Sequence, residues 1–194
     1  MSPKIFELSE REEIKVKMIE AGFELIKTHG MTHASVEKVA EAAGLKKSTF
    51  YNFFPSKEMF VFEIISYQRD FAKEYFNSLL GTREKVTKEE AEAFLKMIIF
   101  SERSIYRYLT AEDMEKLRKA LPSKYGINPA EESIIIGALF SHMEDVREDV
   151  DFKLMANIIK IMAIAFMNRE SLHKDALDRT IEVMYQTLFS LIFK

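Results

Sequence analysis

Residues 35–57 read SVEKVAEAAGLKKSTFYNFFPSK and carry the clearest structural signals in the chain. Ser35 is a common helix N-cap residue, because its side-chain oxygen accepts a hydrogen bond from a backbone N–H that has no partner inside the helix. Gly44 suits the left-handed conformation in which many helices end, and Pro55 disfavours helical geometry in the residue before it. We therefore expect two short helices joined by a tight turn. The buried face of the first helix is expected to carry Val36, Val39, Ala40 and Ala43.

The second helix is expected to run from Lys46 to Phe54. At about 100° per residue, Phe50 and Phe54 point inward together, and the opposite face is small, polar and cationic. This is the pattern of a helix-turn-helix whose second helix enters a major groove, with lysines near phosphates and small polar side chains near base edges. A helical hairpin with a solvated polar face has the same spacing, so the residues alone leave both interpretations open. The outward residues are Lys46, Lys47, Ser48, Thr49, Tyr51 and Asn52.

The segment GLKKSTFYNFFPSK, residues 44–57, resembles the recognition helix of the TetR family of transcriptional regulators and the start of the helix that follows it. It aligns without a gap, and Gly30, Ser35, Val39-Ala40 and Ala43 fall at the family's usual upstream positions. The likeness covers about the first sixty residues; beyond that point the family shares an architecture and not motifs. The resemblance implies phosphate contacts from Ser35, Tyr51 and Lys57. It implies base or groove contacts from Lys46, Lys47, Ser48, Thr49 and Asn52.

Two residues depart from the family pattern. Lys46 replaces the usual Ser or Thr cap, so the second helix should start with a weaker cap and more positive charge. Phe53 stands where the family commonly has Tyr or His, so a hydrogen bond to phosphate is expected to be missing. Both departures change the expected set of DNA contacts, and neither removes the motif.

The composition predicts an all-helical globular protein. Of 194 residues, 47% are hydrophobic and 30% charged, as in ordinary globular domains. The few glycines and prolines favour long regular elements, and the absence of cysteine fits a reducing cytoplasm. The N-terminal residues are too charged for a signal peptide, and the most apolar run, residues 154–167, is too short to cross a membrane. We expect a cytoplasmic protein without a membrane partner.

The charge distribution is modest for a protein that binds nucleic acid. The net charge is −3, but the chain up to Lys57 has nine Lys/Arg against eight Asp/Glu, and the acidic excess lies in the remainder. We therefore expect affinity for DNA to depend on dimerisation and geometry and not on bulk charge.

Helical spacing and capping signals predict two domains: a three-helix domain with the helix-turn-helix in residues 1–55, and a helical effector-binding and dimerisation domain in residues 56–194. Capping boxes at Ser9–Glu12 and Thr87–Glu90 are expected to start helices, and Asn128-Pro129 should start another. The inward side of the first helix is expected to carry Ile14, Met18, Ala21 and Leu25, widened by Gly22 and Ile26, and Gly30 is expected to stop this helix. That of the helix after Ser56 should carry Phe60, Ile64, Tyr67, Phe71 and Tyr75. The expected helices are residues 10–28, 36–43, 46–54, 57–80, 88–109, 111–121, 129–147, 152–167 and 175–193.

The last two predicted helices carry more apolar surface than a small domain readily covers. A symmetric dimer that forms a four-helix bundle would bury it, and the family resemblance implies the same. Burial of both faces within one chain is the alternative. The expected interface residues are Ile158, Ile159, Met162, Phe166, Leu177, Ile181, Met184, Leu188 and Leu191.

A small-molecule effector that binds between the C-terminal helices could change the spacing of the two recognition helices, through different affinities for two conformations. The lining residues suggest an apolar or aromatic effector. Plain core packing explains any one of these residues equally well, and His142 also fits a hydrogen-bonded structural histidine. The candidate residues are Met97, Phe100, Tyr108, Phe140, His142 and Met143.

Signals for catalysis are missing from the sequence. There is no glycine-rich phosphate loop, no GxSxG and no cysteine nucleophile, and the four histidines are scattered along the sequence with no cysteine to complete a metal site. We expect no enzyme activity, no cofactor and no metal. The predicted function is a dimeric transcriptional regulator that binds a palindromic operator, with repression taken from the resemblance alone. The alternative is a dimeric helical scaffold for other proteins with a vestigial DNA-binding domain.

Overall fold

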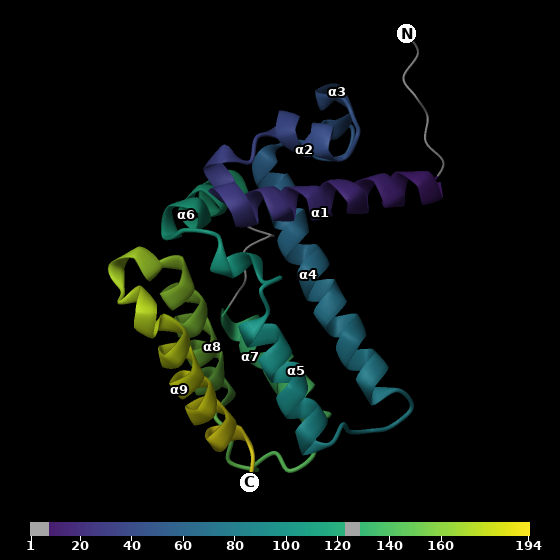
Figure 1. The fold of residues 1–194 in the computed structure, drawn as a ribbon. Coiled ribbons are helices and arrows are strands. Elements are labelled where there is room, and N and C mark those ends of the chain that lie inside the picture. The colour runs from purple at the N-terminus through teal and green to yellow at the C-terminus, as the bar shows by residue number, and fades with distance from the viewer. Residues whose placement is uncertain (1–7, 123–128) are drawn as a thin grey trace. The chain divides into compact units, whose positions relative to one another are not determined.

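The computed structural model describes residues 8–122 and 129–194, and these ranges form helices joined by turns (Figure 1). The all-α prediction, with an N-terminal helix-turn-helix and a helical C-terminal part, is confirmed. Contacts divide the chain into two compact units. The first contains the residues up to Arg69 together with Glu112–Leu121, and the second contains Asp70–Ala111 and Pro122–Lys194. The elements are α1 (Leu8–His33), α2 (Val36–Ala42), α3 (Lys47–Phe50), α4 (Lys57–Leu80), α5 (Lys88–Phe100), η1 (Ile105–Arg107), α6 (Ala111–Ala120), α7 (Pro129–Ser141), α8 (Phe152–Met167), η3 (Arg169–Ser171) and α9 (Lys174–Ile192).

The core of the first unit depends on a close approach between α1 and α4. A Cβ atom added to Gly22 would lie 2.3 Å from Cζ of Phe60, so only glycine fits at this point of α1. Phe60 is itself almost fully buried and has little room to move. Of the predicted inward residues, Ile14, Met18, Gly22 and Ile26 are buried, whereas Ala21 and Leu25 are only half-buried. The buried face of α1 also includes Ile19, Phe23 and Met31.

The two ends of α1 differ in how well local signals predict them. Gly30 has a φ of 76° and a ψ of 162°, which breaks the helix where glycine was expected to stop it. At the other end the Ser9–Glu12 capping box is wrong, because α1 already includes Leu8 and Ser9 therefore lies inside the helix.

The helix that starts at the second capping box is shorter than predicted. Thr87 and Glu90 form the expected box, in which the Thr87 side chain accepts from the Glu90 N–H and Glu90 accepts from the Thr87 N–H. However, α5 ends at Phe100 and not near Leu109. At its end the Ser101 hydroxyl accepts a hydrogen bond from the Arg103 N–H at 3.0 Å. Such a local side-chain bond competes with helical bonding and favours a turn.

The helix predicted to run to Arg147 ends at Ser141. The backbone of the residues after Ser141 forms hydrogen bonds with distant segments instead of continuing the helix. The Val86 N–H donates to the His142 carbonyl at 2.9 Å, and the Arg147 N–H donates to the Ile192 carbonyl at 2.8 Å. Asp145 has a positive φ of 56°, which helix geometry excludes. The expected cap Asn128 lies outside the described residues.

The second unit is built around α8 and α9, which run antiparallel and side by side (Figure 1). Its core includes Phe94, Phe140 and Tyr185. The predicted inward face of α4 is wrong in this unit, because Phe71 and Tyr75 are exposed and Phe76 is buried in their place. Among the described residues, no helix combines the length and the apolar character needed to cross a bilayer.

The close approach at Gly22 leads to a stability prediction. Gly22→Ala should lower the free energy of unfolding by about 1–3 kcal/mol, because the added methyl overlaps the buried Phe60 ring. Urea unfolding followed by circular dichroism measures this change.

Gly137→Ala is the matched control, since Gly137 also lies within a helix but an added Cβ there would meet Phe152 at an ordinary 3.4 Å. This variant should be neutral or stabilised by up to about 1 kcal/mol, because alanine favours helix more than glycine does. Equal losses in both variants would contradict the steric explanation.

Candidate nucleic-acid interface

The turn between α2 and α3 forms as the sequence predicts. Ser35 precedes α2 with extended backbone angles, and its hydroxyl accepts a hydrogen bond from the Lys38 N–H at 3.3 Å. Gly44 has a φ of 72°, and the Leu45 N–H donates to the Ala40 carbonyl at 2.8 Å. Val39 and Ala40 are buried, whereas Val36 and Ala43 are half-buried. These contacts fix the direction in which the chain enters α3.

The second helix is shorter than predicted. Regular α-helix covers only Lys47–Phe50, and turns continue it towards Phe54, whose N–H donates to the Phe50 carbonyl at 3.0 Å. Lys46 occupies the N-cap position without a side-chain hydrogen bond to the backbone, as expected for lysine in place of Ser or Thr. A helix this short is not stable without tertiary packing.

Aromatic packing supplies that support. The ring centroid of Phe50 lies 5.2 Å from that of Phe54 and 5.1 Å from that of Phe60. Phe54 and Phe60 are 4.8 Å apart with an interplanar angle of 65°, an edge-on arrangement that aromatic quadrupoles favour. All three side chains are buried. The cluster holds α3 against the start of α4, so the opposite face of α3 is turned outward.

The outward face carries the side chains that the sequence analysis assigned to it. Thr49 is half-buried beside them. The exposed residues are Lys46, Lys47, Ser48, Tyr51 and Asn52.

Lys57 is less free than the other lysines of this region. It is half-buried, and its Nζ donates to the Thr32 carbonyl at 3.2 Å, which ties the start of α4 to the end of α1. Burial lowers the pKa of the Lys57 ammonium. A phosphate near this ammonium would restore the favourable surroundings that burial removes.

Lys47 forms an ion pair with a residue that the sequence analysis did not single out. Its Nζ lies 2.8 Å from Oε1 of Glu37, near the start of α2, with side-chain exposures of 52% and 66% respectively. Their hydrogen bond and opposite charges lower the pKa of Glu37 and raise that of Lys47. The two residues are ten apart in sequence and lie on different helices, so helical periodicity does not predict their ion pair.

Arg11 contacts the turn that follows α3. Its Nη2 donates to the Asn52 carbonyl at 2.8 Å, and its guanidinium carbon lies 4.5 Å from the centre of the Phe53 ring. Phe53, the second departure from the family pattern, thus packs under an arginine. This contact positions Asn52. Arg11 and Asn52 are 41 residues apart in sequence, so local sequence patterns do not predict the contact.

The structure places the predicted effector residues in and around the core of the second unit. Phe140 and Met143 are buried, and Met97 and Phe100 are half-buried against the same core. The half-buried Tyr108 donates its hydroxyl to the Glu102 carbonyl at 2.8 Å. His142 is exposed beyond the end of α7, and its Nδ1 donates to the Glu84 carbonyl at 3.0 Å. This is the hydrogen-bonded histidine that the sequence analysis left open as an alternative.

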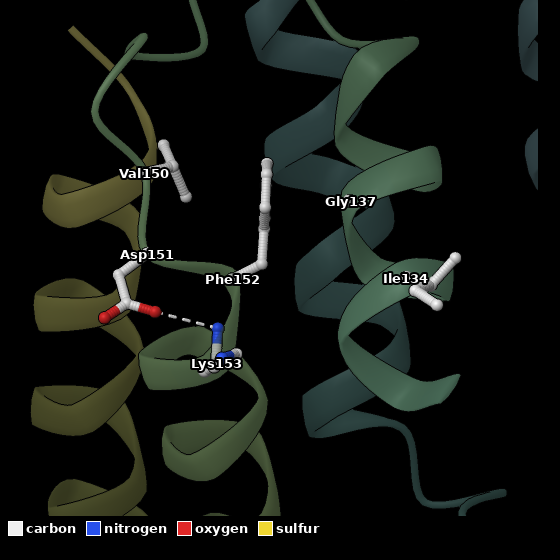
Figure 2. A pocket seen from close by; sticks show the side chains of 6 residues that line it. All are labelled: Ile134, Gly137, Val150, Asp151, Phe152 and Lys153. Carbon is white, nitrogen blue, oxygen red and sulfur yellow. Dashed lines mark hydrogen bonds between the residues drawn. The ribbon is translucent and has the colours of Figure 1, made fainter. Parts of the chain in front are cut away.

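An open hollow of about 530 Å³ lies elsewhere in this unit, between α7 and the start of α8 (Figure 2). Phe152 stands beside Gly137 of α7. Asp151 is engaged as the cap of α8, with its Oδ1 accepting from the Lys153 and Leu154 N–H groups. None of the predicted effector residues lines this hollow. Its lining consists of Ile134, Gly137, Val150, Asp151, Phe152 and Lys153.

The residues predicted for a dimer interface divide by burial. Ile158, Ile159 and Met184 are half-buried, and Leu191 is exposed. The rest are buried within the single chain, namely Met162, Phe166, Leu177, Ile181 and Leu188. Within the described residues, no three His, Asp or Glu side chains are arranged to hold a metal ion.

A family model described as "Bacterial regulatory proteins, tetR family" matches residues 18–64, the segment that contains α2, α3 and the aromatic cluster. The N-terminal part of the chain is therefore similar to the TetR family of regulators. Proteins of the TetR family are DNA-binding transcriptional regulators. A comparison with curated proteins finds no match.

Solved structures share the fold over nearly the whole chain. A TetR-family regulator from Cytophaga hutchinsonii has a TM-score of 0.60 at 18% identity, with 98% of each chain covered. The fatty acid degradation regulator FadR from Bacillus halodurans has a TM-score of 0.55 at 16% identity, covering 90% of this chain and 97% of its own. NalD is the secondary repressor of the MexAB-OprM multidrug efflux pump in Pseudomonas aeruginosa. Its structure has a TM-score of 0.51 at 15% identity, covering 94% of this chain and 98% of its own.

The cap at Ser35 can be separated from any role of this residue in DNA binding. Ser35→Ala should lower the free energy of unfolding by about 1 kcal/mol, because the Lys38 N–H loses its acceptor. Ser35→Asn keeps a capping oxygen and should unfold like the wild-type protein. Denaturant titration without DNA makes the comparison, and an undiminished stability of Ser35→Ala would show that the cap contributes nothing.

Proposed function

We propose that this protein binds a palindromic operator as a homodimer and represses transcription under the control of a small, largely apolar effector. The observation that carries the proposal is the outward face of α3, where Ser48 and Asn52 are exposed together with two lysines and Tyr51, while Phe50 is buried. Hydroxyl and amide groups can hydrogen-bond base edges, and lysines attract phosphates. NalD, which shares the fold, is a repressor, and this supports the same mode of regulation here. A protein that regulates transcription in this way would act in the bacterial cytoplasm.

The proposed contacts divide into two groups. Ser35, Tyr51 and Lys57 would bind phosphates and fix the orientation of the domain. Lys46, Lys47, Ser48, Thr49 and Asn52 would reach base edges or the groove. One short helix offers few contacts, so useful selectivity requires two helices presented about 34–36 Å apart to successive turns of the duplex.

The exposed apolar residues of α8 and α9 support a dimer. Ile161 and Ile164 of α8 are exposed, and Val183 and Leu191 are exposed eight residues apart on α9. Both pairs follow helical spacing that places them on one face of their helix. Several of the predicted interface residues are already buried within the single chain. We therefore assign the contact with the partner to these four exposed side chains, of which only Leu191 belongs to the predicted set. Two copies of this helix pair would form a four-helix bundle.

For the effector, we propose the apolar region around Met97, Phe100 and Tyr108, whose side chains are only partly buried. Phe140 and Met143 lie behind it in the core, and His142 would contribute by holding the Glu84 backbone. The apolar character of this region favours an apolar effector.

Selection of bound duplexes from a random pool tests the proposal most directly. The expected product is a two-fold symmetric sequence with half-sites one helical turn or a multiple of it apart. Binding should weaken steeply as salt rises. A scaffold with a vestigial DNA-binding domain would enrich no sequence.

Two substitutions test the division of roles. Asn52→Ala should relax selectivity at particular operator positions, costing on the order of 1–3 kcal/mol there if a base edge is read. Lys57→Ala should weaken binding to every duplex and make the salt slope shallower by about 0.9. Fluorescence anisotropy with operator and point-mutated duplexes measures both. Because Lys57 also bonds Thr32, a drop in stability with an unchanged salt slope would assign Lys57 a structural role alone.

The proposed interface predicts that exposed apolar residues of α8 and α9 control dimerisation. Ile161→Asp, and separately Val183→Asp, should give monomers in sedimentation experiments, because a carboxylate in an apolar bundle is costly. Ile134→Asp on α7 is the control: Ile134 is 70% exposed, against 51% for Ile161. It should remain dimeric. Loss of the dimer in the control alone would place the interface elsewhere.

A further inference from the structure

We propose that Glu37, through its ion pair with Lys47, sets the selectivity of the DNA-binding face by penalising contacts with phosphate alone. This inference rests on the proposed function and adds a residue to it. Glu37 and Lys47 lie on different helices of the helix-turn-helix, and both are exposed on the side that carries Ser48 and Asn52. Any duplex that reaches Lys47 therefore also meets the carboxylate of Glu37.

The two groups of the pair respond differently to a phosphate and to a base edge. A phosphate can attract Lys47, but its negative charge repels Glu37, which accepts hydrogen bonds and cannot donate them when ionised. The pKa of Glu37 is lowered by Lys47, so the carboxylate stays ionised at neutral pH. Binding that uses the DNA backbone alone thus carries an unfavourable contact.

The major groove can satisfy both groups at once. Every base pair presents a keto oxygen next to an exocyclic amino group, and these two atoms are joined by the base-pair hydrogen bond. Their separation is therefore a hydrogen-bond length, similar to the 2.8 Å between Nζ of Lys47 and Oε1 of Glu37. In the groove Lys47 can donate to the keto oxygen of guanine or thymine, and Glu37 can accept from the amino group of cytosine or adenine. The orientation of the base pair decides whether both contacts form.

The charges of the rest of the domain make this effect important. Lys57 is half-buried and bonded to Thr32, and Arg11 is engaged with Asn52 and Phe53. Lys47 is thus one of a small set of exposed cations on this face. Its ion pair with Glu37 cancels much of the long-range attraction between Lys47 and a phosphate. Exposed pairs are weak, so the pair can rearrange when a matching base pair approaches.

The experiment compares the wild-type protein with Glu37→Gln on two duplexes, the operator selected from the random pool and a scrambled duplex of equal length, over a series of salt concentrations. Glu37→Gln should bind the scrambled duplex about three- to tenfold more tightly at low salt, since a like-charge contact is removed. Its salt slope on that duplex should steepen by up to about 0.9, as expected for one more effective phosphate contact. Operator affinity should not rise by the same factor, so the selectivity ratio should fall.

Two further variants separate this mechanism from a general change of charge. Glu41→Gln removes the same charge one turn further along α2, where the residue is exposed but is not the partner of Lys47. Glu41→Gln should change the ratio of operator affinity to scrambled-duplex affinity much less than Glu37→Gln does. In a Lys47→Gln background, Glu37→Gln should no longer steepen the salt slope, because the cation that it frees for phosphate is missing.

The outcomes distinguish this inference from the function on which it depends. If the wild-type protein prefers no sequence, the proposed function fails and the role of Glu37 fails with it. If the wild-type protein is selective but Glu37→Gln leaves the ratio unchanged, or if Glu41→Gln lowers it equally, only the role of Glu37 is overturned. Unfolding curves of all variants should overlap, because an exposed pair contributes little to stability.

Discussion

The packing of the Phe60 ring over Gly22 is the contact on which the helix-turn-helix unit depends. The missing side chain of Gly22 lets Phe60 lie against α1, and Phe50 and Phe54 then pack on Phe60. Since α3 has only four residues of regular helix, it has no stability of its own and takes its position from this aromatic cluster. The orientation of Ser48 and Asn52 therefore follows from apolar contacts on the opposite side of the same helix.

Local signals in the sequence predicted what local forces determine. The cap at Ser35, the turn at Gly44 and the capping box at Thr87 act over a few residues, and each is present in the structure. The ends of α5 and α7 were wrong because other hydrogen bonds compete with the helix there. In α7 the competing partners, Val86 and the end of α9, are distant in sequence. No helical pattern contains that information.

The candidate interface shows the same division. The spacing of Phe50 and Phe54 was enough to identify the outward face of α3, and all but one of its polar residues are exposed. What spacing could not show is which of these groups are already engaged. Lys47 binds Glu37, Lys57 binds the Thr32 carbonyl, and the Asn52 backbone accepts from Arg11. These contacts arise only when α1, α2 and α3 pack together. They leave the side chains of this face less free to move than the number of its lysines suggests.

The segment Glu112–Leu121 belongs to the compact unit of the helix-turn-helix, although the chain passes through Asp70–Ala111 of the other unit before reaching it. The first unit is thus discontinuous in sequence. A truncated fragment that stops after α4 would lack α6, and a chimera that exchanges N-terminal segments between relatives would combine α6 of one parent with α1 of the other. A graft of this helix-turn-helix unit onto another protein therefore has to include both segments.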